Sequence, residues 1–536
     1  MSSHLKLPHF VIIKILNYYF YSNGFRYLKI KDLVDKLDHI SLVSKLFREI
    51  VTKLHIKNII NDEVKPQNYD SLKRYLDKGL DIEISNINCT KDMVEIFSQH
   101  AISMKYDNKL HNIDNEIFPK VQSLHLFNTK MTDIILNDKP FPSLLSLTIN
   151  YKYDDDTIPI QFFKCPSIDP GKFNIQSLTN LNIEPKSDSQ SLMIGTTVLG
   201  SYLPNLKKLS IGTSQTTAGS SFEDLFQKLS INTTLETFIL KIGATIDANW
   251  MVECINKNKT LKYLDIQAWS LVDPDNTCDI DITNDTLEYF SFDKRNVVPF
   301  RFYIFYHIWA TKSNLRKLFL PMMNFQETSY LLDSIQTFHS NTVKSIDLII
   351  YINNSVMKIL ACTIIEMNIP TLEQLDIKII HELKHQIGLT FCDLCKSLKV
   401  NNHLKDLQFQ TTQVNVKSLN EFIQSNHPSL TRLSLSKCFL ANGAPGLANA
   451  LMSNHTLKSF CFSNELTVTS VIDIIKTNRT LQSIIFLSFP IVTSAYIASF
   501  EEAIANNHVL SNIYISSISS YIKEILLKYS ICMNYN

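Results

Sequence analysis

The chemically most suggestive residues in this chain of 536 lie in His381-Glu382-Leu383-Lys384-His385. On a helix, two histidines four positions apart share one face and can bind zinc, while the glutamate beside the first histidine acts as general base. The longer metalloprotease pattern continues with a glycine, matched by Gly388, and a third histidine, where this chain has Phe391. Because that ligand is missing, we expect no catalytic zinc. A zinc hydrolase stays as an alternative that metal analysis of the purified protein tests.

Two cysteines, Cys392 and Cys395, follow this segment and could add thiolate ligands. Two histidines and two cysteines are the right ligand types for structural zinc, but their spacing matches no common zinc finger. If residues 389–398 form a helix, Leu394 and Leu398 face the core and the cysteines are small packing residues. We therefore expect ordinary packing there, and neither a metal nor a cofactor in the protein.

Other catalytic signatures are missing. The sequence has no phosphate-binding G-x-x-x-x-G-K-(Ser/Thr) loop, no G-x-S-x-G nucleophile elbow, no dinucleotide fingerprint and only 11 glycines. Lysine and arginine number 52 against 51 acidic residues, so no overall charge attracts nucleic acid or membranes. These features predict a protein that is not an enzyme and that binds neither nucleic acid nor membranes.

The chain also lacks the marks of export and of membrane insertion. Its first residues, MSSHLKLPHFVIIKIL, carry a lysine inside the apolar run and no small-residue cleavage site, which is unlike a secretory signal. No stretch approaches the run of about 18 apolar residues that a membrane-spanning helix needs. The ten cysteines are scattered, as is typical of reduced thiols. We expect a cytoplasmic or nuclear protein.

A short motif, Leu-x-x-Leu-x-Leu or a variant ending in Ile, recurs through most of the chain. Its clearest copies are LKKLSI, LKYLDI, LRKLFL, LEQLDI and LTRLSL, which begin at Leu206, Leu261, Leu315, Leu372 and Leu430. With looser copies between them, successive copies from Leu178 to Leu510 start 24 to 32 residues apart. A period of this size indicates a solenoid of stacked units and argues against several globular domains.

Each unit is predicted to contain a strand, a loop and a helix. Apolar and polar residues alternate in the motif from Tyr263 on, which is typical of a strand with one buried face. The stretch after the motif changes to helical spacing, as at Phe222, Leu225 and Leu229. An asparagine stands three residues before the first Leu in many units, and we interpret it as a left-handed residue that ends the helix. These asparagines are Asn232, Asn258, Asn284, Asn454, Asn478 and Asn507.

These residues resemble the leucine-rich repeat family, in particular the long repeats of ribonuclease inhibitor. The resemblance covers roughly residues 119–516 and is specific in the strand motif, whereas the family's Asn or Cys in the following turn is seldom present, Cys438 being one match. The resemblance implies an α/β solenoid shaped as a horseshoe. Residues 61–118 are then a linker and N-terminal capping repeat, and residues 517–536 a C-terminal cap.

Residues 1–60 do not follow the repeat, and they resemble an F-box. That family's pattern is a Leu-Pro start, an Ile-Leu pair, and then Leu-x-x-Val-(Ser/Cys)-(Lys/Arg)-x-(Trp/Phe). The apolar residues of the two halves here are Leu7, Pro8, Ile12, Ile15, Leu16, Leu42, Val43 and Phe47. The linker between the halves is longer than usual, and Phe47 stands where Trp is more common. In the family this segment docks the adaptor of a cullin-RING ubiquitin ligase. The alternative is a plain amphipathic helical cap for the solenoid.

The third and fifth residues of each motif point away from the core, so the concave face of the sheet is the candidate surface for a partner protein. The candidate partner-binding residues are Tyr263, Asp265, Tyr289, Phe319, Asp347, Asp376 and Asp406. Asp347 and Asp376 are expected in one column on strands about 4.8 Å apart, where they repel unless a cation or a basic partner relieves them. This arrangement predicts a groove for a basic segment, anchored on the three aromatic residues. The alternative is a solvated polar face without function.

Together these patterns predict the substrate-recognition adaptor of an SCF-type cullin-RING ubiquitin ligase. Its F-box-like segment would bind the ligase adaptor, and its repeats would hold an unknown substrate protein. The second hypothesis is a leucine-rich repeat scaffold or inhibitor protein without a link to a ligase.

Overall fold

The computed structural model describes less than half of the N-terminal part and most of the C-terminal part of the chain. The described residues are 28–29, 37, 55–60, 73–77, 81–85, 101–107, 119–127, 143–150, 177–184, 188–200, 203–212, 222–243, 245–268, 270–272, 282–294, 314–320, 342–351, 355–380, 391–410, 414–436, 446–462, 466–486, 494–515, 522, 525–526, 528–529 and 531. The chain forms two compact bodies, the N-terminal body Met1–Ile246 and the C-terminal body Asp247–Asn536.

In the N-terminal body, the strands from β1 to β9 each pair in parallel with the next strand along the chain. They are β1 (Leu28–Lys29), β2 (His55–Ile60), β3 (Asp81–Ser85), β4 (Ala101–Asp107), β5 (Ser123–Phe127), β6 (Ser146–Asn150), β7 (Asn180–Glu184), β8 (Lys208–Gly212) and β9 (Thr237–Lys241). Helix α8 (Asp188–Gly200) connects β7 to β8, and α9 (Glu223–Ile231) connects β8 to β9. The short strand β10 (Thr245–Asp247) follows β9.

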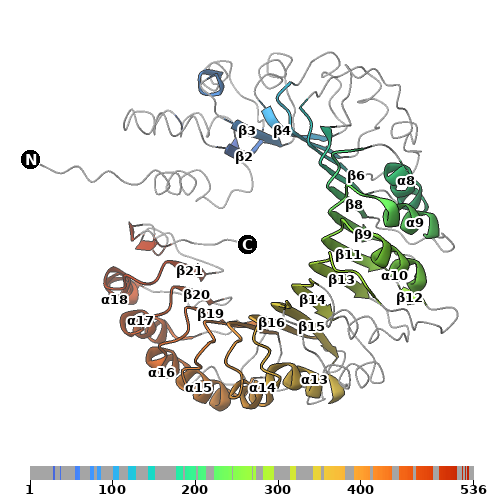
Figure 1. Cartoon of the computed structure of the whole chain (residues 1–536). Coiled ribbons are helices and arrows are strands. Elements are labelled where there is room, and N and C mark those ends of the chain that lie inside the picture. The colour runs from blue at the N-terminus through green and yellow to red at the C-terminus, as the bar shows by residue number, and fades with distance from the viewer. Residues whose placement is uncertain are drawn as a thin grey trace, which may run out of the picture. The chain divides into compact units, whose positions relative to one another are not determined.

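The C-terminal body continues the same alternation. Its elements are α10 (Ala248–Lys257), β11 (Tyr263–Ala268), β12 (Ser270–Val272), β13 (Tyr289–Lys294), β14 (Lys317–Leu320), β15 (Ser345–Tyr351), α13 (Ser355–Glu366), β16 (Gln374–Ile380), α14 (Phe391–Leu398), β17 (Asp406–Gln410), α15 (Val416–Gln424), β18 (Arg432–Ser436), α16 (Leu447–Ser453), β19 (Ser459–Phe462), α17 (Val468–Thr477), β20 (Ser483–Phe486), α18 (Ser494–Ala505) and β21 (Asn512–Ile515). β11 pairs in parallel with β13, and from there each strand pairs with the next. Helices α13 to α18 lie along one side of these strands (Figure 1).

The core lies between strands and helices and is built from the apolar positions of the repeated motif. Leu430, Leu433 and Leu435 of one copy are fully buried, and so are Leu419 and the other apolar residues of the facing helix stripe. Burying one such side chain stabilises the fold by about 1.5–3 kcal/mol, so stacking supplies what a lone strand–helix unit lacks. The predicted mixed α/β architecture with long parallel sheets is confirmed, and it is compatible with a solenoid.

The parallel strands begin earlier than the repeat boundary that the sequence pattern placed at residue 119. β2 falls within residues 1–60, and β3 and β4 fall within residues 61–118. β3, Asp81-Ile-Glu-Ile-Ser, lacks the two leading leucines of the motif and keeps only the alternation. Because pairing in a parallel sheet depends on backbone hydrogen bonds and on alternation, a strand can join the array without the full motif.

The joint is the turn from a helix into the next strand. The asparagines at four joints, Asn232, Asn258, Asn454 and Asn478, do end the helices α9, α10, α16 and α17, but their backbones are extended and not left-handed as predicted from the sequence. Asn232 has φ −70° and ψ 129°, and Asn258 has φ −75° and ψ 126°. Among the described residues, the asparagines with positive φ are two others, Asn368 and Asn426. The joint asparagines therefore act through their side chains.

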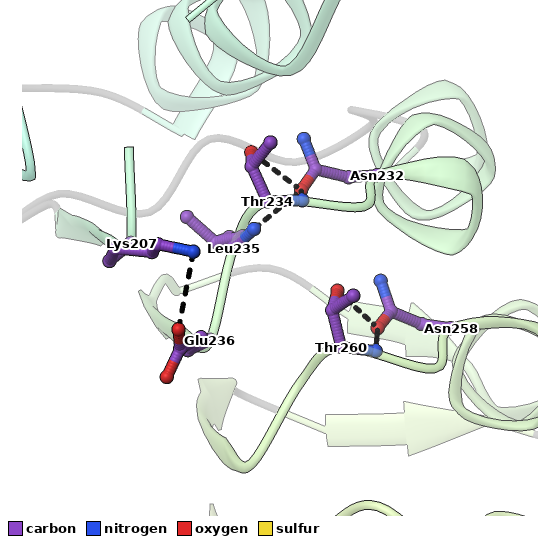
Figure 2. Close-up of polar contacts among 7 residues, drawn as sticks. All are labelled: Lys207, Asn232, Thr234, Leu235, Glu236, Asn258 and Thr260. Carbon is purple, nitrogen blue, oxygen red and sulfur yellow. Dashed lines mark hydrogen bonds and ion pairs between the residues drawn. The ribbon is translucent and has the colours of Figure 1, made fainter. Parts of the chain in front are cut away.

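Each joint asparagine accepts the amide hydrogens that lead into its own strand. The Oδ1 atom of Asn232 accepts hydrogen bonds from the N–H of Thr234 and Leu235, at 3.1 and 2.8 Å (Figure 2). Asn258 holds Thr260 in the same way, as Figure 2 shows. These backbone groups lie in a buried turn where water cannot replace the lost bonds, so the side chain satisfies them.

The Nδ2 end of the same amide caps the helix of the preceding repeat. The Nδ2 group of Asn478 donates to the carbonyl oxygen of Leu451 at 2.7 Å and to that of Asn454 at 2.9 Å. Leu451 lies in the last turn of α16, whose carbonyls have no partner within the helix. Asn284 and Asn507 make the equivalent bonds to Ile255 and Ile475. One side chain thus fastens each strand to the helix of the repeat before it.

Ion pairs link the second motif position of one repeat to that of the next. Lys207 pairs with Glu236 at 3.3 Å, as Figure 2 shows, and Arg316 pairs with Glu288 at 3.4 Å. Lys405 pairs with Glu373 at 2.9 Å, and this contact lowers the pKa of the Glu373 carboxyl. The partners are largely exposed, so each pair adds little stability and mainly favours this alignment of neighbouring strands.

The hydrogen bonds of the joint predict that substituting Asn401 lowers the stability of the protein, whereas substituting its neighbour Asn402 does not. Asn401, 2% exposed, donates to the carbonyl of Ile365 and accepts from the N–H of His403 and Leu404. Asn401→Ala should lower the free energy of unfolding by about 2–4 kcal/mol, because it leaves buried backbone groups unsatisfied. Urea denaturation followed by circular dichroism measures the change.

The control is Asn402→Ala, since the Asn402 side chain is exposed and its backbone N–H bond to Asn368 survives the substitution. That variant should stay within about 0.5 kcal/mol of the parent protein. Equal losses in the two variants would show that the buried amide does not carry the joint.

Candidate functional site

The candidate site is the sheet face, meaning the residues of β11 to β18 that point away from the buried leucines. Strand register aligns them in two rows. The first row is Tyr263, Tyr289, Lys317, Ser345, Gln374, Asp406 and Arg432. The second row contains Asp265 and Ser291, and then Phe319, Asp347, Asp376 and Gln408. The predicted alignment of Asp347 with Asp376 on adjacent strands is confirmed.

Two tyrosines form a stack at one end of the first row. The rings of Tyr263 and Tyr289 lie 4.1 Å apart between centroids and 6° from parallel. The ammonium of Lys317 lies 6.0 Å from the Tyr289 centroid, at the limit of a cation–π contact. Burial raises the pKa of the Tyr263 hydroxyl, and a hydrogen bond to Tyr289 and the charge of Asp265 raise it further. The stack is therefore an ordered, uncharged aromatic surface.

Three carboxylates of the sheet face, Asp347, Asp376 and Asp406, are paired with cations of the chain itself. Lys317 Nζ lies 2.7 Å from Asp347 Oδ2, and Lys378 Nζ lies 3.2 Å from Asp376 Oδ2. The guanidinium of Arg432 lies 3.7 Å from Asp406 Oδ2. The sequence predicts that a bound cation or a basic partner relieves the repulsion between these carboxylates, whereas in the structure the chain's own cations do so.

Lys378 and Arg432 lie at positions that the comparison of motif residues does not cover, which explains why the sequence did not predict their ion pairs. Lys378 is the first residue beyond the motif, where β16 continues to Ile380. Arg432 belongs to the next strand, in register with Asp406. Extending each motif by two residues and comparing adjacent columns is the sequence signal that would have found them, because residues two apart on a strand share one face.

Internal pairing leaves part of the carboxylate charge uncompensated. Burial raises the pKa of Asp376, and the nearby Asp347 carboxylate adds to the rise, against the effect of Lys378 and Lys317. Burial also raises the pKa of Asp406, with a contribution from Asp376, against the effect of Arg432 and a hydrogen bond from Gln408. Within the described residues, the Oδ1 atoms of Asp376 and Asp406 are buried without a hydrogen-bond partner. Because both atoms are buried, a donor reaches these oxygens only after the aspartate side chains move.

The remaining predicted residues of the face lie beside these groups. Asp265 is 8% exposed, and its Oδ2 accepts a hydrogen bond from Gln267 at 3.2 Å. Phe319 is half-buried and in register with Asp347, next to the lysine that pairs with that carboxylate. The structure thus brings all seven predicted partner-binding residues onto one face of one sheet within the C-terminal body.

The predicted ligase-docking residues, from Leu7 to Phe47, lie outside the described residues. Of residues 1–60, the structure describes 28–29, 37 and 55–60. The docking prediction therefore remains a prediction from sequence.

The His381–His385 segment also lies outside the described residues, but both nearby cysteines are described. Cys392 and Cys395 lie on α14, where Leu394 and Leu398 are fully buried as predicted. Cys395 is buried, and its Sγ lies 3.9 Å from the carbonyl oxygen of Ser418. Burial raises the pKa of the Cys395 thiol. The geometry agrees with the expected packing role.

Comparison with protein-family models gives no match, and comparison with curated proteins gives none either. Of the helices that the structure describes, none has both the length and the apolar content to cross a bilayer. The described residues also contain no group of three or more His, Cys, Asp or Glu side chains placed to hold a metal ion.

The raised pKa of Asp376 predicts the effect of removing its charge. The folded protein holds the carboxyl proton more tightly than the unfolded chain, whose value is near 3.8. Ionisation therefore costs stability above the folded-state pKa, and this cost vanishes as the pH falls below the unfolded value. Asp376→Asn should leave the free energy of unfolding at neutral pH unchanged or raise it, as measured by urea denaturation.

Asp473→Asn is the matched control, because Asp473 is exposed on α17. That substitution should change stability by no more than about 0.5 kcal/mol. A loss above about 1 kcal/mol that is confined to Asp376→Asn would contradict this account, since it would mean that the Lys378 ion pair outweighs the cost of burial.

Proposed function

We propose that this chain is a protein-binding adaptor that holds a partner protein on the sheet face of its C-terminal body. We further propose that it is a leucine-rich repeat solenoid whose F-box-like segment connects the bound protein to a cullin-RING ubiquitin ligase. The observation that carries the binding role is the row of stacked tyrosines beside the ion-paired carboxylates. Its adaptor role needs no chemistry, because holding a substrate near the ligase raises its effective concentration.

The sheet face has the properties of a binding surface. Tyrosines are enriched at the energetic centres of protein interfaces, since they offer a large apolar area with little rotamer entropy to lose. The ring stack of Tyr263 and Tyr289 fixes this area in advance. A partner that docks against an ordered surface loses less conformational entropy on binding.

The partner that fits best is a segment with arginine or lysine side chains next to an apolar or aromatic group. Among the named face residues, four carboxylates stand against three cations, so the face keeps a slight negative charge. Once the two side chains turn toward a docked segment, the Oδ1 atoms of Asp376 and Asp406, which are buried without a hydrogen-bond partner in the structure described, can accept hydrogen bonds from guanidinium or ammonium groups. Since Lys378 and Arg432 already pair with the other oxygens of these carboxylates, salt should weaken this binding less than it would weaken binding to a bare acidic cluster.

The link to a ubiquitin ligase rests on the sequence order of the two F-box halves ahead of the repeats. A scaffold or inhibitor without that link remains the second candidate function. It would use the same sheet face, so the two candidates differ in the N-terminal segment alone.

Replacing Leu7, Ile15 and Leu16 together with Asp should abolish capture of the cullin-RING ligase adaptor from cells, because three charges would enter an apolar interface. Affinity capture followed by mass spectrometry measures the loss. The control introduces Asp at the polar positions Ser2, Ser3 and Asn17 and should retain the adaptor. Adaptor binding that survives in the first variant, or is absent in the parent protein, favours the scaffold.

Replacing Tyr263 and Tyr289 with Ala should weaken capture of the substrate protein by about tenfold or more, because truncating aromatic anchors typically costs at least 1–2 kcal/mol each. Quantitative proximity labelling compares this variant with the parent protein and with Tyr496→Ala. Tyr496 is an exposed aromatic residue on α18, outside the sheet face.

A genuine partner of the sheet face is lost from the double variant and kept by Tyr496→Ala. The ligase adaptor should stay bound to both variants. If every captured protein responds equally to the two tyrosine changes, the recognition surface lies elsewhere on the chain.

A further inference from the structure

One joint of the C-terminal body is built around a histidine. His427 occupies the place that an asparagine holds in the neighbouring joints, between α15 and β18. Its Nδ1 atom accepts the N–H of Leu430 at 3.1 Å and that of Ser429 at 3.4 Å. In the next joint, Asn454 Oδ1 accepts the amide hydrogens at the same two offsets, from Leu457 and Thr456.

The second ring nitrogen reproduces the other half of the joint. His427 Nε2 lies 3.0 Å from the carbonyl oxygen of Leu398, at the end of α14. Asn454 Nδ2 donates likewise to Ile423, in the last turn of α15. Because Nδ1 accepts two backbone N–H groups and Nε2 faces a carbonyl, the geometry requires the neutral ring with its proton on Nε2.

Protonation changes this histidine in a way that an asparagine cannot match. A proton on Nδ1 would point at the N–H groups of Ser429 and Leu430, replacing two acceptor contacts by donor–donor repulsion. The residue is 6% exposed, so water cannot easily take over those bonds. An asparagine amide keeps the same donors and acceptors at every pH at which the protein is folded.

The surroundings of His427 provide no charge that would favour the imidazolium. Burial lowers its pKa, and contacts with the backbone of Leu398 and Asn401 oppose that effect. The ring of Phe422 from α15 lies 5.9 Å away between centroids. The charged residues on the elements packed around it are Asp393, Lys396 and Lys399 at α14, Lys417 and Glu421 at α15, Lys405 and Asp406 at β17 and Arg432 at β18. Among the described residues, none of these contributes to the shift.

We propose that His427 makes the joint between α15 and β18, which it ties to the end of α14, an acid-sensitive point in the solenoid, which loosens on mild acidification while the asparagine joints on its C-terminal side stay closed. The loosening separates the strand entry at Ser429 and Leu430 from the end of α14. It lies directly before β18, which carries Arg432 of the sheet face.

The pH range in which the joint loosens follows from the direction in which the pKa of His427 is shifted. The folded-state pKa of His427 lies below the unfolded value of 6.5, so the joint has its full stability above that value. Stability is lost as the pH falls from the unfolded value toward the folded one, because the open joint binds the proton more tightly. At about pH 5.5, one unit below the open-state value, linkage limits the increase in opening to about tenfold.

Hydrogen–deuterium exchange of the full chain tests the proposal at about pH 7.5 and about pH 5.5. After correction for the intrinsic exchange rate, the amides of Ser429 and Leu430 should lose protection by up to about tenfold at the lower pH. The amides of Thr456 and Leu457, held by Asn454, should not change and serve as the reference in the same sample. Equal changes in both joints, or none at Leu430, would overturn the proposal.

Two variants and one direct titration complete the test. His427→Asn should remove the pH dependence at Leu430. His455→Asn should keep it, because His455 is exposed in the turn of the next joint. NMR titration of the parent protein, which needs no variant, should show a neutral His427 with its proton on Nε2 and a pKa below 6.5. A proton on Nδ1, or a pKa at or above that value, would refute the mechanism whether or not the variants fold.

Discussion

The structure depends on satisfying the backbone groups at every passage from helix to strand. The last carbonyls of a helix and the first N–H groups of the following strand lie in the same buried turn, and unpaired groups there would be costly. A single side-chain amide supplies two donors and an acceptor, which is what the turn requires. Asn478 shows the complete arrangement, since it bonds two carbonyls of the preceding repeat and two amides of its own. Apolar stacking supplies the free energy, and these bonds fix how one repeat meets the next.

The same stacking governs the sheet face. In a parallel array, residues at one motif position line up at the strand spacing, so each repeat contributes to a continuous row. Tyrosines on successive strands therefore stack, and carboxylates on successive strands repel. Lys317 and Lys378 relieve the repulsion between the carboxylates of Asp347 and Asp376. Among the described residues, some carboxylate oxygens nevertheless stay buried and without a hydrogen-bond partner. A surface built in this way is ordered before a partner arrives, and its remaining polar groups favour a partner that brings hydrogen-bond donors.

Different residues serve stability and the proposed recognition: the joint asparagines stabilise the fold, and the sheet face is the proposed binding surface. The asparagine side chains lie at the helix end of the repeats, while the residues proposed for recognition lie on the strands and point the other way. Substitutions on the face can therefore change partner choice with little effect on the fold. At His427 the two roles come close, because this joint leads directly into the strand that carries Arg432. A protonation event at the joint can thus reach a face residue through a few residues of backbone.

The sequence by itself determined the repeat period, the strand–helix alternation and the buried positions, because apolar residues at regular spacing have few ways to leave water. It also placed Asp347 and Asp376 side by side, since register follows from the motif. Sequence could not show that the joint asparagines are extended, because side-chain hydrogen bonds to a repeat 24 to 32 residues away outweigh a local backbone preference. It also missed the strands before residue 119, which follow the alternation without the leucines. The pairing of Lys378 and Arg432 with the carboxylates depended on which side chains the stacked strands bring within reach, and only the tertiary structure decided that.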